Sequence, residues 1–91
     1  MAIIYQTYSF AEAQCKVNIA SNKAEADLWV YNVNNRGLAN GDAIWYVIDE
    51  RSAASIRVYF CSRGMSDLVI YFVNNKLQAG WQREHRLKSR L

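Results

Sequence analysis

Catalysis by an imidazole would have to use His85, because this is the only histidine in the chain. It lies in the charged stretch 83–86, with no partner nearby in the sequence. We therefore predict a surface or tail-docking histidine, and no catalytic residue. A phosphate-binding loop is also absent, since the glycines at positions 37, 41, 64 and 80 are isolated. The residue types thus predict that the protein is not an enzyme.

Three aspartates, Asp27, Asp42 and Asp67, recur at one position of a repeated unit. Paired carboxylates can perform general acid–base catalysis or bind a cation. However, a catalytic pair needs two different environments, whereas these three residues repeat one. An aspartate at the start of a strand more often accepts backbone N–H bonds. We therefore predict a structural role, and neither a metal site nor a cofactor site.

Five basic residues also recur, one after each unit. If the turns gather at one end of the fold, these residues form a cationic ring that could hold a phosphate or a nucleic-acid backbone. Alternatively, each cation fastens its own turn by bonding loop carbonyls or pairing with a recurring aspartate. The second interpretation is favoured because the body of the protein is neutral. The five residues are Lys23, Arg36, Arg51, Arg63 and Lys76.

The net charge of +3 comes entirely from the last segment. Residues 81–91 hold four basic residues and one acidic residue, whereas residues 1–80 hold seven of each. This tail could bind a polyanion weakly. We favour a solvated segment that keeps the protein soluble. The tail completes the set of candidate anion-binding residues with Arg83, Arg86, Lys88 and Arg90.

The 91 residues allow one domain, residues 1–91, and 52% of them are hydrophobic, as in a globular protein. Cys15 and Cys61 form no metal-binding or redox motif, so buried free thiols are predicted; a disulfide would need a non-reducing compartment. The start of the chain lacks a secretory signal, and no apolar run approaches the roughly 20 residues of a membrane span. These features predict a cytoplasmic protein.

Short repeated units dominate the chain. Segments 27–34, 42–49, 55–62 and 67–74 each open with Asp or Ser, place Tyr four residues later and close with a small polar residue. Segment 14–21 is a weaker copy, and residues 3–13 are a degenerate one. The units are rich in Val, Ile, Tyr, Phe and Trp and too short for ordinary helices, so they are predicted to be strands. Around 23–26 and 76–79 the chain could form a single helical turn.

Both faces of several strands are apolar. Leu68 and Ile70 alternate with Val69 and Tyr71, so the strand is expected to be covered on both sides. Asn32 and Arg57 break the pattern and predict a wetter face. In so short a protein, both faces can be covered only if parts of the chain wrap around other parts of the same chain. The tryptophans and tyrosines are predicted to form the core rather than stack bases, with Trp81 plugging the fold where the tail leaves: Trp29, Trp45, Trp81 and the repeated tyrosines.

The series of units, closing in Ala-Gly-Trp, resembles the septoil-knot domain family. The matching stretches are 25–31, 41–46, 56–60, 67–73 and 79–81, and the resemblance covers residues 12–85. It implies a compact, mostly β domain with a 7(1) knotted backbone, and no established activity or catalytic residues. This sequence departs from the pattern where Asn40 and Gly41 split one unit, and at Cys61 and Ser66.

Together, these features predict a single compact, mostly β domain of six or seven short strands. The strands lie in 12–15-residue repeats joined by short turns or single helical turns, with a basic tail at 82–91. We predict a monomeric, non-enzymatic, kinetically stable structural or binding module without a cofactor. The alternative is a nucleic-acid-binding accessory protein that uses the basic tail and the basic turn residues.

Overall fold

The computed structural model describes residues 2–91 and confirms a mostly β single domain. Seven short strands alternate with six single turns of 3₁₀ helix. The strands are β1 (Ala2–Gln6), β2 (Cys15–Ile19), β3 (Leu28–Val33), β4 (Ile44–Ile48), β5 (Ile56–Phe60), β6 (Leu68–Phe72) and β7 (Gly80–Trp81). The turns are η1 (Phe10–Glu12), η2 (Lys23–Glu25), η3 (Arg36–Leu38), η4 (Arg51–Ala53), η5 (Arg63–Met65) and η6 (Lys76–Gln78).

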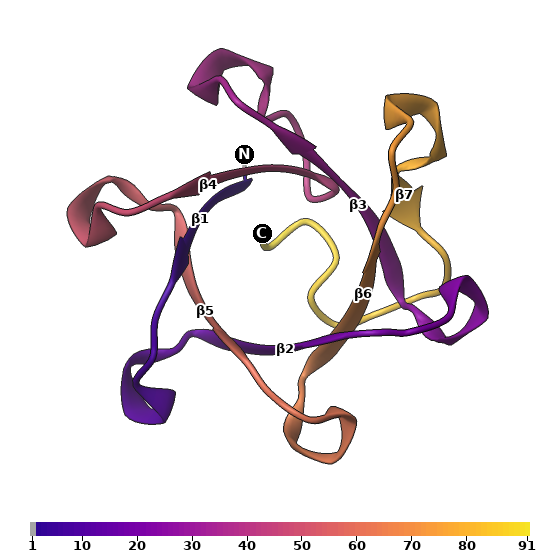
Figure 1. Ribbon diagram of the computed structural model, residues 1–91, viewed down its shortest axis with the longest axis horizontal. Helices are drawn as coiled ribbons and strands as arrows, with labels where there is room; N and C mark the ends of the chain where they lie inside the picture. The colour runs from indigo at the N-terminus through magenta and orange to yellow at the C-terminus, as the bar shows by residue number, and fades with distance from the viewer. Residues whose placement is uncertain (1) are drawn as a thin grey trace.

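Six parallel strands close into a barrel in the order β4-β1-β5-β2-β6-β3, with β3 also pairing β4. The two-residue β7 adds to β3 in the antiparallel direction. Apart from β3 and β4, strands that follow one another in the chain are not neighbours in the sheet. The chain therefore circles the barrel twice, and the second circuit fills the spaces between the strands of the first (Figure 1).

Each 3₁₀ turn projects outward from the wall of the barrel, and we call each of these projections an arm (Figure 1). Asparagine begins three of these turns: the side chains of Asn22, Asn35 and Asn75 accept a hydrogen bond from the backbone N–H two residues later, at 2.8–3.0 Å. This local bond stabilises a chain reversal. The single helical turns predicted at 23–26 and 76–79 are confirmed. The other four connections also contain a single turn of 3₁₀ helix.

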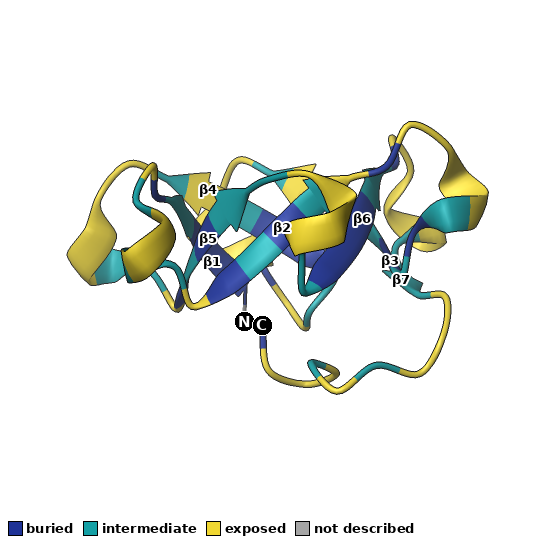
Figure 2. Cartoon of the chain, turned by 90° about the horizontal axis from the view of Figure 1, so that it is seen from below, coloured by how far each residue is buried: buried dark blue, intermediate teal, exposed yellow. Residues whose placement is uncertain are grey.

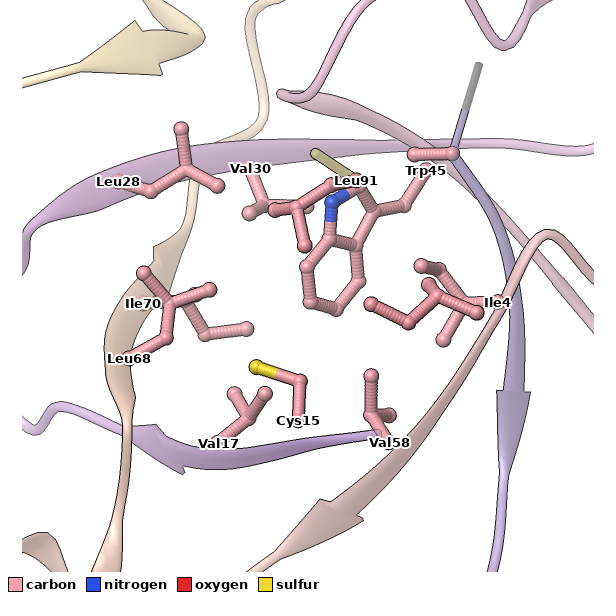
Figure 3. Close-up of a cluster of buried hydrophobic side chains, with 12 residues drawn as sticks. Ile4, Cys15, Val17, Leu28, Val30, Trp45, Val58, Leu68, Ile70 and Leu91 are labelled. Atoms are coloured by element: carbon pink, nitrogen blue, oxygen red, sulfur yellow. The ribbon is translucent and has the colours of Figure 1, made fainter. Parts of the chain in front are cut away.

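The core lies inside the barrel, where alternate residues of the six parallel strands meet (Figure 3). Trp45 fills the centre and is fully buried, with Phe72 edge-on at a centroid distance of 6.2 Å. Teal and yellow residues on the outer face show that it is only partly covered (Figure 2). There, Trp29 and Tyr71 pack on a small second cluster, and most tyrosines are half-buried. The expectation that the strands are covered on both sides is therefore too strong, because six short arms cannot cover the whole outer face. The expectation that the tryptophans and repeated tyrosines form the core holds fully only for Trp45.

The tail crosses the end of the barrel where the strands begin (Figure 2). Leu91 reaches into the core cluster and is 7% exposed, and Leu87 packs against the same cluster. Trp81 contacts the cluster from the rim. The expected plug therefore exists, but the two leucines of the tail share it with the tryptophan.

Candidate functional site

The residues that open each repeat bind the neighbouring strand. Asp27 donates its backbone N–H to the carbonyl of Val69 at 2.7 Å and accepts the N–H of Val69 on Oδ2 at 3.1 Å. Asp67 forms the same reciprocal pair with Lys16. Ser55 does so with Ile3. The predicted structural role of these openers is confirmed, because a side-chain oxygen replaces the missing backbone acceptor at the start of each strand.

Asp42 is the exception among the recurring aspartates. Its Oδ2 accepts the indole N–H of Trp81 at 2.9 Å and the backbone N–H of Ser89. Its Oδ1 accepts the backbone N–H of Leu91 at 3.1 Å. One carboxylate thus ties β7 and the tail to the start of β4. In the sequence, Asp42 occupies the same repeat position as the other openers. Its different role, binding the tail, is seen only in the tertiary structure.

His85 docks the tail onto the barrel. Its ring stacks on Trp81 at a centroid distance of 5.4 Å, and its side chain is 14% exposed. Nδ1 accepts the backbone N–H of Leu87, while Nε2 faces Asp27 Oδ2 at 3.7 Å. The structure therefore brings a carboxylate to the imidazole that the sequence alone does not place there. Both ring nitrogens face groups of the chain itself, which fits the predicted tail-docking histidine.

Most cations of the tail have acceptors within the chain. Arg83 lies 3.5 Å from Asp27 and donates to the carbonyl of Ala24. Arg86 pairs with Asp67 at 3.0 Å, and Lys88 pairs with Glu84 at 3.1 Å. The cation of each pair is at least half exposed, so each pair contributes about 0–1 kcal/mol. The side chain of Arg90 has no such partner in the part of the chain that the structure describes.

The basic turn residues do not gather at one end, because the arms that carry them radiate around the circumference (Figure 1). Arg51 pairs with Glu12 at 2.9 Å and Arg63 pairs with Glu25 at 2.6 Å. Arg36 donates to the carbonyl of Ala53 at 3.0 Å. Each guanidinium therefore bonds the neighbouring arm. The predicted fastening role fits, although the acidic partners are glutamates rather than the recurring aspartates.

The two lysines of this series behave differently. Lys23 Nζ lies 4.9 Å from the ring centroid of Trp29. Lys76 pairs with no side chain among residues 2–91. Each lysine lines a cleft between two arms. The Lys76 cleft, about 470 Å³, is lined by Tyr31, Asn32, Val33, Asn34, Leu38 and Lys76. The Lys23 cleft, about 430 Å³, is lined by Lys23, Tyr71, Phe72, Val73, Asn74 and Gln78.

Sequence reasoning missed these clefts and the two glutamates that pair with the arginines. Glu12 and Glu25 occupy the third position of η1 and η2. The corresponding residues of the other four turns carry no charge: Leu38, Ala53, Met65 and Gln78. The sequence shows which turns carry an acid at that position. Only the order of the arms in space shows which cation faces an acid and which faces an uncharged residue.

Both cysteines are free. Burial, with a smaller contribution from the Asp67 carboxylate, raises the pKa of the Cys15 thiol to about 11. The same two causes raise the pKa of Cys61, which follows β5 and is only partly buried. The prediction of two buried thiols is correct for Cys15 and too strong for Cys61. A high pKa keeps the thiol protonated at neutral pH and therefore unreactive.

No cluster of three or more histidine, cysteine, aspartate or glutamate side chains suited to a metal ion occurs within residues 2–91. Over the same residues, no helix is long and apolar enough to span a membrane.

Comparison with known families identifies this architecture. The profile of the 7(1) septoil knot domain matches residues 1–82, and the chain therefore belongs to that family. The family accounts for the interleaved strands, and its name describes a backbone knotted as 7(1). Residues 83–91, the larger part of the tail, lie beyond the match. Searches among curated proteins and among solved structures found no match.

Proposed function

We propose that this septoil-knot chain is a non-enzymatic, kinetically stable module that serves a structural or binding role. The observation that carries the proposal is the interleaving of the barrel. Ile3 bonds Ser55, 52 residues away, and Lys16 bonds Asp67, 51 residues away. Neighbouring strands in the barrel therefore come mostly from opposite halves of the chain.

Interleaving favours kinetic stability for two reasons. Contacts between distant residues form slowly, because the chain loses loop entropy before the contacts stabilise it. A backbone knotted as the family implies must also be unthreaded before the chain is fully unfolded. Operational stability then depends on the unfolding rate rather than on the equilibrium free energy alone. Such a module suits a protein that must keep its surface intact in the presence of proteases.

Unfolding kinetics test the proposal. Tryptophan fluorescence, to which the fully buried Trp45 contributes, provides the signal after a jump into concentrated guanidinium. We expect unfolding over minutes or longer after extrapolation to water, within the range known for small domains. Digestion by thermolysin should proceed at the same slow rate and should not accelerate with more protease. Unfolding within milliseconds, as for an unknotted hairpin domain, would contradict the proposal.

We extend the proposal to a monomer in the cytoplasm. Each strand of the six-stranded barrel is paired on both sides, so these strands offer no edge to a second copy. The free thiols of Cys15 and Cys61 fit a reducing compartment. Sedimentation at micromolar concentration should give the mass of one chain. A dimer under these conditions would overturn the monomeric state without affecting the unfolding test.

Nucleic-acid binding through the tail stays a prediction. A labelled single strand and a labelled duplex, followed by anisotropy at low and physiological salt, provide the test. The prediction requires affinity that falls steeply with salt and is lost when Arg83 and Arg86 are both changed to glutamine. Failure to bind at low salt would remove this alternative.

A further inference from the structure

Three of the six gaps between neighbouring arms share one kind of contact. In each of them an arginine, the first residue of one 3₁₀ turn, bonds the third residue of the next arm in space. Arg36 of η3 bonds Ala53 of η4, and Arg51 of η4 bonds Glu12 of η1. Arg63 of η5 bonds Glu25 of η2. At η1 the first residue is aromatic instead, and its ring packs edge-on against Tyr59.

Two neighbouring gaps depart from this pattern, one on each side of η6 (Figure 1). In the gap between η6 and η3, Lys76 lies across from Leu38, and both line one cleft. In the gap between η2 and η6, Lys23 lies across from Gln78, and both line the other cleft. In these two gaps a lysine lines a cleft opposite an uncharged residue, whereas Arg51 and Arg63 pair with glutamates at the equivalent position of two other gaps. In a repetitive fold, local departures of this kind mark candidate functional sites.

We propose that the two clefts flanking η6 together form a binding site for an acidic peptide segment of a partner protein. The proposal rests on the binding role proposed above and identifies the surface that would bind the partner. In it, the carboxylates of the partner take the places that Glu12 and Glu25 take at the η4–η1 and η5–η2 gaps. We call these two ion-paired gaps the closed gaps. Neither cleft is lined by an acidic residue that would repel the partner.

The lining of the clefts favours a peptide over a small inorganic anion. Val33 and Leu38 provide an apolar wall beside Lys76. Asparagine amides line both clefts and can bond the backbone of an extended segment. Leu77, which follows Lys76 in η6, is 93% exposed and adds apolar surface. A segment that alternates acidic and apolar side chains matches this arrangement, since its carboxylates reach the lysines while its apolar groups cover the walls.

The test uses the full chain and a short capped peptide of alternating glutamate and leucine at low ionic strength. Amide resonances in a ¹⁵N–¹H spectrum report where the peptide binds. We expect shifts confined to residues near 31–38, 71–78 and Lys23. Lys76→Gln and Lys23→Gln should each weaken binding about two- to fivefold, the effect of removing one exposed ion pair. Arg63→Gln, at the same repeat position in a closed gap, is the matched control and should bind as the parent does.

A second variant gives Lys76 an acidic partner from the chain itself, inside the Lys76 cleft. Leu38→Glu places an acid at the position that Glu12 and Glu25 occupy in their turns, within reach of Lys76. It keeps the lysine but should abolish the shifts around residues 31–38. Because Leu38 is 47% exposed, the change should not disturb the core, which the dispersion of the spectrum will show.

Four outcomes would overturn the proposal. They are no shifts at millimolar peptide, shifts at the tail or the closed gaps, equal binding of a glutamine–leucine peptide, and equal binding of inorganic phosphate at the same residues. The last would indicate a general oxyanion site. Slow unfolding in guanidinium does not depend on these results, so a failure of the peptide site and a failure of the proposed scaffold role are distinguishable.

Discussion

The carboxylate of Asp42 should determine whether the tail stays on the barrel. Three N–H groups converge on it, from Trp81, Ser89 and Leu91. Asp42→Ala removes all three acceptor contacts and leaves the backbone carbonyl that binds the Trp45 indole. The barrel strands keep their own pairing, so we expect the variant to fold with a released tail.

The cost follows from these three bonds. A hydrogen bond to a charged group contributes about 1.5–3 kcal/mol. Because Asp42 is only partly buried, the released N–H groups regain water, and we expect a total loss of about 3 kcal/mol rather than the full sum. In a domain of this size such a loss lowers Tm by about 15 °C.

Guanidinium and thermal unfolding measure this loss, and trypsin measures the release of the tail. The exposed carboxylate Asp49, at the other end of the same repeat, provides the control Asp49→Ala, which should stay within about 0.5 kcal/mol of the parent. Trypsin should cleave at Arg86 and Lys88 faster in Asp42→Ala than in the parent or the control. Equal stability of the two variants, together with equal cleavage, would refute the role assigned to Asp42.

Two further predictions concern the buried thiol of Cys15 and the left-handed backbone of Gly41. The raised pKa of Cys15, about 11 against an ordinary 9.0, means that the unfolded chain loses this proton first as pH rises. Stability from this group should be complete below pH 9 and fall by about 2 kcal/mol by pH 11. Cys15→Ala should lose less over this range, and equal pH curves would exclude the thiol as the source. Gly41, at φ +74°, should lose about 1–2 kcal/mol on change to alanine, as a left-handed residue does. Gly64→Ala, where the backbone is not left-handed and the space is open, should be neutral in the same denaturation assay; equal effects would count against backbone strain at Gly41.

The sequence alone indicates much of the local structure. The strands follow from their composition and side-chain alternation, and two of the six single helical turns are predicted at polar chain reversals, which begin at Asn22 and Asn75. The structural role of Asp27 and Asp67 follows from the chemistry of a short carboxylate beside free backbone N–H groups. These features depend on a few adjacent residues, so a single sequence suffices to predict them.

Only the tertiary structure decides which segments become neighbours. Arg51 pairs with Glu12 and Arg63 with Glu25 because the barrel interleaves two circuits of the chain. The same order leaves Lys23 and Lys76 facing uncharged residues and brings Asp42 beneath the tail. Local patterns specify that a strand exists and which face is apolar, but many strand orders satisfy them equally. The choice among those orders is made by the packing of the whole barrel around Trp45, and that packing acts between residues far apart in the chain.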